Sequence, residues 1–121
     1  MGTLYIGNRL VTPFVKVGGT EPTIVTVSGS TFNNTINNNT IYNASTLTSL
    51  SGTFPNDIGV GFVSQFDFTS GSTPTAINMN VVWTGDNANE TTFVPRSNCR
   101  YTIMFYYDGV NVRGFISGTS I

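Results

Sequence analysis

The fold class is decided by the stretch Arg100-Tyr-Thr-Ile-Met-Phe-Tyr-Tyr-Asp-Gly-Val-Asn-Val-Arg-Gly-Phe-Ile116. It predicts one β-hairpin, because two runs of β-branched and aromatic residues flank Asp108-Gly109, a dipeptide that suits the positive φ angles of a two-residue type I′ turn. That turn places one apolar face opposite a wetter face, which holds Tyr106, Asn111, Met104 and Arg113. The predicted cross-strand pairs are Tyr107 with Val110, Phe105 with Val112, Ile103 with Gly114, and Tyr101 with Ile116.

The residues before the hairpin predict further short strands separated by turn signals. Apolar residues alternate with polar or small ones in two long stretches, which is typical of half-buried strands. The predicted inward-facing residues are Ile58, Val60, Phe62, Phe66 and Phe68 in the first stretch and Ile77, Met79, Val81 and Trp83 in the second. With short strands at 3–6, 9–12, 23–27 and 91–94, the chain offers about eight strands. We therefore predict an all-β fold, an antiparallel β-sandwich or a jelly roll.

The 121 residues are expected to form a single β domain, residues 1–121, with three differently patterned segments. Residues 1–27 carry the N-terminal strands, and residues 58–121 form a strongly patterned β module. Residues 31–52 are rich in Asn, Thr and Ser, and their sparse apolar residues match neither a strand nor a helix period. Two interpretations of residues 31–52 stay open: a flexible surface loop, or an extended segment ordered against neighbouring subunits.

Composition excludes several classes of protein. Only 9% of residues are charged and the net charge is −1, with five scattered basic residues, so the chain lacks the positive surface that a nucleic acid or an anionic membrane needs. No apolar run is long enough to cross a bilayer as a helix. The single cysteine, Cys99, is expected to be a buried thiol, and the start of the sequence does not read as a signal peptide, which predicts synthesis in a cytoplasm.

The side chains available for chemistry argue against an enzyme. There is no histidine, which excludes Ser-His-Asp and Cys-His catalysis and histidine-ligated metal sites. Among the carboxylates, only Asp86 and Glu90 share one predicted loop. That loop spaces oxygen atoms as a calcium loop does, but Thr91 and Ser97 stand where an EF-hand has its glycine and its last glutamate. We therefore expect no catalytic residues, no cofactor and no metal.

One candidate ligand site remains around the same loop. An aromatic ring could stack on a sugar while neighbouring amides and carboxylates form hydrogen bonds to it. The candidate residues are Trp83, Asp86, Asn87, Asn89, Glu90 and Tyr106. The competing interpretation places Trp83 in the core, because it is in phase with Val81 and Met79.

Four stretches together resemble a β-module of tailed-bacteriophage virion proteins, found in head-fibre, tail-fibre and capsid-decoration contexts. They cover about half the chain and are Phe66-Asp-Phe-Thr-Ser-Gly-Ser-Thr-Pro-Thr75, Val82-Trp-Thr-Gly85, Phe93-Val-Pro-Arg96, and Arg100-Tyr-Thr-Ile-Met-Phe-Tyr-Tyr-Asp-Gly-Val-Asn-Val112 continuing through Gly118. The opening Leu4-Tyr-Ile-Gly-Asn-Arg-Leu-Val-Thr-Pro13 is similar to the start of many short phage structural proteins. The resemblance carries no catalytic residues.

This resemblance implies a non-enzymatic structural protein located in the virion. Its partners would be copies of itself, as a homotrimer or another homo-oligomer, and other virion proteins, with assembly by strand pairing and apolar burial. The alternative is a carbohydrate-binding or receptor-binding adhesion module whose partner is a host-surface glycan.

Overall fold

The computed structural model describes residues 21–121 of the chain. The strands predicted at 3–6 and 9–12 lie outside the described residues. Within residues 21–121 the regular structure consists of nine β-strands and no helix, so the all-β prediction is confirmed. The strands are β1 Thr23–Val27, β2 Thr31–Phe32, β3 Thr40–Thr46, β4 Ser49–Leu50, β5 Val63–Ser70, β6 Ala76–Ile77, β7 Val82–Gly85, β8 Cys99–Tyr107 and β9 Val112–Ser120.

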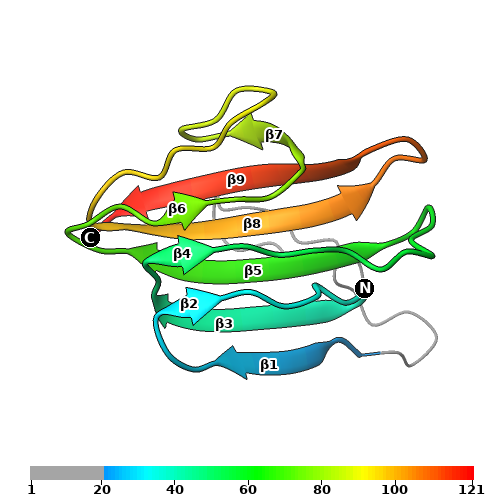
Figure 1. Cartoon of the computed structure of the whole chain (residues 1–121), viewed down its shortest axis with the longest axis horizontal. Helices are drawn as coiled ribbons and strands as arrows, with labels where there is room; N and C mark the ends of the chain where they lie inside the picture. The colour runs from blue at the N-terminus through cyan, green and yellow to red at the C-terminus, as the bar shows by residue number, and fades with distance from the viewer. Residues whose placement is uncertain (1–20) are drawn as a thin grey trace.

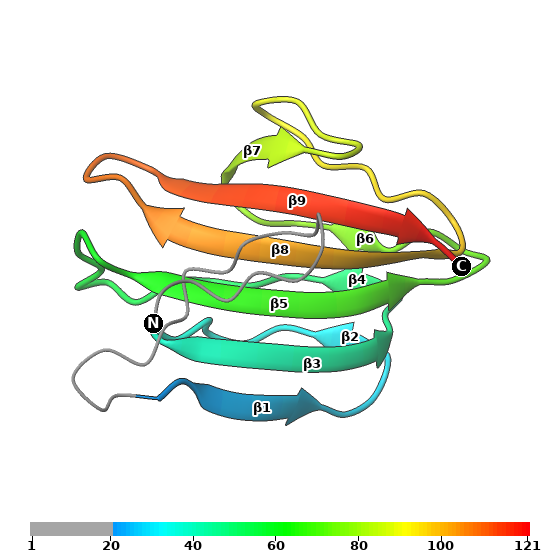
Figure 2. The ribbon, with the colours of Figure 1, turned by 180° about the vertical axis from the view of Figure 1, so that it is seen from behind.

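These strands form two sheets that lie one in front of the other (Figure 1). The larger sheet has six strands in the order β1-β3-β5-β8-β9-β7, and Figure 2 shows the same order from behind. The smaller sheet has three strands in the order β2-β4-β6. One continuous apolar core draws residues from both sheets.

The first six strands alternate between the two sheets and stack as three rungs of a short β-solenoid. We define the rungs as β1 with β2, β3 with β4, and β5 with β6. Every strand in these rungs runs parallel to its neighbour in the next rung. The backbone between strands continues the stacking, since the Thr48 N–H donates to the Ser30 carbonyl at 2.7 Å and the Ala76 N–H donates to the Thr48 carbonyl at 2.9 Å.

The remaining strands, β7, β8 and β9, cap one end of the solenoid. β8 pairs antiparallel with β5 and with β9, and β7 pairs parallel with β9. The antiparallel pairing predicted for the whole fold is therefore wrong for the three rungs and right for the central strands of the large sheet. The reason is that consecutive strands in the rungs change sheets, so the chain returns to each sheet in the same direction.

The predicted hairpin is present as β8 and β9, but its predicted register is wrong by two residues. Tyr107 pairs with Val112 and Ile103 with Ile116, so the connecting loop contains four residues, 108–111. Only Gly109 has a positive φ in this loop, at 99°, which excludes a type I′ turn. Because side chains alternate with a period of two, the shift keeps the residues of the paired strands on their predicted faces. Val110 and Asn111 move into the loop instead, and Val110 is 79% exposed.

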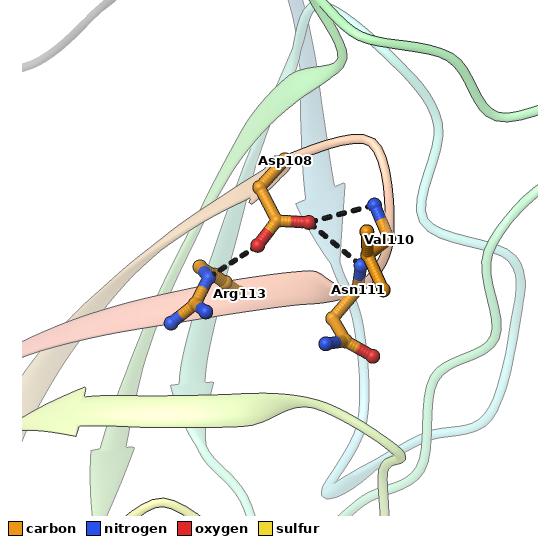
Figure 3. A network of polar contacts seen from close by, with 4 residues as sticks. All are labelled: Asp108, Val110, Asn111 and Arg113. Atoms are coloured by element: carbon orange, nitrogen blue, oxygen red, sulfur yellow. Dashed lines mark hydrogen bonds and ion pairs between the residues drawn. The ribbon is translucent and has the colours of Figure 1, made fainter.

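Asp108 explains the longer loop (Figure 3). Its Oδ1 accepts hydrogen bonds from the backbone N–H groups of Val110, at 2.8 Å, and Asn111, at 2.7 Å, while its Oδ2 pairs with Nε of Arg113. These donors lower the pKa of the Asp108 carboxyl from 3.8 to about 2, the N–H of Asn111 contributing most and Arg113 next. The carboxylate thus closes the loop that the dipeptide alone was expected to close.

The core between the sheets is built largely from aromatic rings. Tyr42 of β3 and Phe66 of β5 are direct cross-strand neighbours, and their rings stack with centroids 5.5 Å apart. Phe68 stacks on Tyr101 at the same distance, which joins the third rung to the cap. Ser64 also faces inward and is fully buried, and among the described residues its hydroxyl has no hydrogen-bond partner. Ser64 lies within β5, so the polar residue does not interrupt the strand.

Residues 31–52 are ordered within the chain and form the second rung with part of the first. They contain β2, β3 and β4, and their sparse apolar residues are buried except Ile41, which is half-buried. The asparagines connect successive rungs: Asn39 has a φ of 53°, its N–H donates to the Val63 carbonyl at 2.7 Å, and Asn38 Oδ1 accepts from the Val63 N–H at 3.0 Å. Asparagine tolerates this left-handed conformation better than most residues. Within the described residues the segment is therefore not structureless, because its strands pair with other strands of the same chain.

Candidate functional site

The loop predicted to bind a ligand, residues 86–90, belongs to a segment, residues 86–92, that folds back along β7 and is held by backbone hydrogen bonds. Ala88 and Phe93 form a β-bridge, and the Asn89 N–H donates to the Thr92 carbonyl at 2.9 Å. The carbonyl of Glu90 accepts a hydrogen bond from the Trp83 N–H at 3.2 Å. The loop therefore accepts a hydrogen bond from a backbone N–H group of β7, which is the outermost strand at the capped end of the large sheet.

Asp86 and Asn87 use their side-chain oxygens to fasten the loop to the cap. Asp86 Oδ2 accepts from the Gly118 N–H at 2.9 Å. Asn87 Oδ1 accepts from the Tyr101 hydroxyl at 2.6 Å, and the φ of Asn87 is 64°. Burial raises the pKa of Tyr101, so its hydroxyl stays protonated as the donor of this bond.

Asn89 stabilises the tip of the same loop. Its Oδ1 accepts from the backbone N–H and the hydroxyl of both Thr91 and Thr92, at 2.9 to 3.1 Å. The side-chain oxygens of Asp86, Asn87 and Asn89 therefore all accept hydrogen bonds from within the chain, and they stabilise the fold. Residues 21–121 also hold no group of three or more His, Cys, Asp and Glu side chains placed to bind a metal ion.

The two aromatic candidates lie on opposite faces of the large sheet. Trp83 is 2% exposed and its ring packs against Phe93 and Phe105, so the core interpretation holds. Tyr106 follows Phe105 in β8 and therefore faces the other way, where it is 43% exposed. Asp86, Asn87, Asn89 and Glu90 share one loop, and the structure does not bring them together with both rings.

Among residues 21–121, a different surface has backbone groups that pair with no described strand, and it lies at the opposite end of the solenoid. We define the open end as β1 and β2, the outermost strands of the two sheets at the first rung (Figure 1). Among the strands of residues 21–121, β1 pairs only with β3 and β2 only with β4. An edge strand presents a row of backbone donors and acceptors that can pair with another strand.

The hydrogen-bonding direction along β1 follows from one contact. The Thr23 N–H donates to the Asn39 carbonyl at 2.9 Å, so the backbone groups of Thr23 face β3. Because direction alternates along a strand, those of Val25 and Val27 also face β3, while those of Ile24 and Thr26 face away from the sheet. The outward-facing edge thus offers the N–H and carbonyl groups of Ile24 and Thr26.

The side chains of β1 leave this edge unprotected. The sequence Thr23-Ile-Val-Thr-Val27 has no charge and no proline, which are the usual means of blocking an edge. Val25 and Val27 are half-buried against the core, and Ile24 is 57% exposed on the outer face. The strand itself was predicted from its β-branched residues, but its position at the edge depends on pairings between distant segments.

No protein-family model matches this chain, and it matches neither a curated protein nor a solved structure. In the part of the chain that the structure describes, no helix has the length and apolar character needed to span a membrane.

Proposed function

We propose that this chain is a non-enzymatic structural protein of a bacteriophage virion, which assembles on the capsid or on a fibre by strand pairing and apolar burial. The observation that carries the proposal is the open end. Its edge strand β1 is uncharged and turns the backbone groups of Ile24 and Thr26 outward. A solenoid rung buries its apolar face by stacking on neighbouring rungs, so a rung that no described strand covers favours association with another chain.

The use of the polar side chains supports a structural role. Asp86 and Asp108 accept backbone hydrogen bonds, and Arg100 donates to the Ala44 carbonyl at 2.7 Å and to the Thr69 hydroxyl at 2.9 Å. The Ala44 carbonyl lies where the register between β3 and β5 shifts, so Arg100 stabilises an irregular part of the sheet. These charged groups hold strands and loops in place.

The stretches that resemble phage virion modules fall mainly on β5, β7, β8, β9 and the hairpin loop. Their aromatic residues Phe66, Phe68, Trp83 and Tyr101 are buried where the third rung meets the cap. The resemblance thus concerns a structural module, which favours an assembly role over a catalytic one.

The adhesion alternative has less support. A glycan site around residues 86–92 needs an accessible ring and free polar atoms, whereas Trp83 is buried and the side-chain oxygens of Asp86, Asn87 and Asn89 hold the loop. Tyr106 keeps an exposed ring but faces the opposite side of the sheet from Trp83.

Particle association tests the proposed function. An antibody raised against the purified chain would be used on density-gradient fractions of phage particles released from the source culture, by immunoblotting and by immunogold electron microscopy. We expect the chain to sediment with the particles and the gold to label a fixed place on them. A chain found only in the soluble fractions at the top of the gradient would contradict the proposal.

A further inference from the structure

We propose that β1 pairs with β1 of a second copy of this chain, antiparallel and about a twofold axis at Val25, so that the two large sheets join into one. The inference rests on the proposed assembly role and deepens it by naming the surface, the partner and the register.

The twofold register satisfies the outward-facing backbone groups of β1. With the axis at Val25, Ile24 of each copy lies opposite Thr26 of the other, and both residues turn their N–H and carbonyl groups outward. Opposed residues of this kind exchange both of their hydrogen bonds in an antiparallel pair. A register displaced by one residue would set Ile24 against Val25, whose groups already face β3.

The side chains fit the same register. A twofold axis perpendicular to the sheet keeps core-facing residues on one side, so Val25 meets Val25 of the second copy and Val27 meets Thr23. These residues are uncharged, and Val25 and Val27 are only half-buried in the single chain. β-Branched residues opposed across two strands stabilise a sheet, and like charges, which would oppose the pairing, are absent from β1.

A second copy joined in the same orientation is excluded by the other end of the sheet. Such head-to-tail stacking would place β1 against β7 of the next copy and would grow into a filament. The outer side of β7 is already engaged, because its Trp83 N–H donates to the Glu90 carbonyl. The contact between two β1 strands closes on itself, and it also suits larger assemblies with dihedral symmetry, including one built from trimers.

Cysteine crosslinking tests the register directly. In the proposed pair, the two Val25 residues are non-hydrogen-bonded neighbours with Cα atoms about 4.5 Å apart, within the range of a disulfide. Val25→Cys should therefore give a disulfide-linked dimer on a non-reducing gel after mild oxidation. The control Val27→Cys should give none, because the Val27 residues would lie roughly 14 Å apart at about 3.4 Å per residue. Equal crosslinking of the two variants, or no dimer with either, would overturn the register.

Solution mass tests the contact itself. Light scattering with size-exclusion chromatography should give the wild type at least twice the 13.0 kDa mass of one chain. Thr26→Pro removes only an outward N–H and should halve that mass with an unchanged circular dichroism spectrum, while Thr26→Val keeps the N–H and should behave as the wild type. A monomeric wild type at high micromolar concentration would overturn the inference. If Thr26→Pro fails to fold, the Val25→Cys crosslink decides.

The two proposals can fail separately. A chain that is present in purified particles but monomeric and uncrosslinked in solution would refute the β1 contact alone. A crosslinked dimer that is absent from particles would refute the virion role and leave the contact standing.

Discussion

Two buried tyrosines show how single residues connect loops to the core of this protein. Tyr42 and Tyr101 bury their rings among other aromatic residues. Each hydroxyl then accepts a backbone N–H, that of Asn37 at 2.7 Å for Tyr42 and that of Arg96 at 2.8 Å for Tyr101. Each also donates to an oxygen in a loop. The second rung and the cap thus use the same arrangement, in which an aromatic ring is buried and its hydroxyl group is fully hydrogen-bonded.

The space for the Tyr101 ring comes from a glycine on the neighbouring strand. Gly118 is its direct cross-strand partner, and a Cβ atom there would lie 2.5 Å from Cε1 of the ring. We therefore expect Gly118→Ala to destabilise the protein by about 1 to 3 kcal/mol, the usual cost of overpacking a core. Urea unfolding followed by tryptophan fluorescence would measure the change.

Gly59→Ala is the matched control for Gly118→Ala. A Cβ atom at Gly59 would meet nothing within 4 Å, and its φ is not positive. This variant should unfold at the wild-type midpoint or slightly above it, since alanine restricts the unfolded chain. Equal midpoints for the two alanine variants would show that the ring can move aside.

The partners of individual polar residues could not be predicted from sequence. The phase of Trp83 with Val81 correctly favoured the core, because that argument needs only local alternation. The bonds from Gly118 to Asp86 and from Tyr101 to Asn87 join residues that are distant in the chain. The spacing of residues within the loop therefore suggested a ligand site. In the folded chain, Gly118 and Tyr101 donate the hydrogen bonds that a ligand was expected to donate.

At the scale of elements, the β8–β9 hairpin shows what a turn signal does and does not determine. Asp108-Gly109 located the reversal of the chain, and the alternation of side chains gave the face of each paired strand residue. The prediction of a wetter outer face was wrong for Met104, which is 4% exposed. The loop length depended on the Asp108 carboxylate, which accepts two backbone N–H groups and the Arg113 guanidinium. The turn preference of the Asp-Gly dipeptide cannot predict these hydrogen bonds to the Asp108 side chain.

The Asp108 carboxylate should make the stability of the protein depend on pH. Its pKa is about 2 in the folded chain and 3.8 without these partners. A lowered pKa stabilises the fold at pH values above 3.8, and the contribution is lost as the pH falls toward 2. Asp108→Asn should therefore be less stable than the wild type at pH 6, and the difference should shrink between pH 4 and pH 2, as measured by urea midpoints.

Arg113→Gln separates the two sources of this effect. The largest cause of the low pKa is the N–H of Asn111, with Arg113 second. The arginine variant should therefore keep much of the acid dependence that Asp108→Asn loses. A gap between wild type and Asp108→Asn that stays constant from pH 6 to pH 2 would contradict the assignment.

At the scale of the whole molecule, the solenoid was not predictable because its rungs differ in length. Thr23 pairs with Thr40, and Thr40 with Ser64, so the second interval is longer than the first. The added residues lie in the loop before β5, where Val60 is 80% exposed. Without a fixed spacing the sequence shows no repeat, and short strands with turns then favour an antiparallel sandwich. For the same reason, the sequence could not predict that β1 and β2 form the open end.

The position of the cap in the sequence also affects how the protein folds during and after synthesis. The cap follows the rungs in the chain, so a ribosome releases β1 to β6 before the strands that close the solenoid. The β8–β9 hairpin is the most local pairing among the described strands, and local pairings form fastest. We therefore expect folding to wait for the end of synthesis and then to spread from the cap toward β1.

Pulse-labelled hydrogen exchange during refolding would test this order. Amides of β8 and β9 should gain protection before those of β3, and those of β1 should follow last. Earlier protection of β1 would reverse the direction. If the order holds, the strand exposed for the longest time is the uncharged edge, and the nascent chain needs shielding there until a second copy arrives.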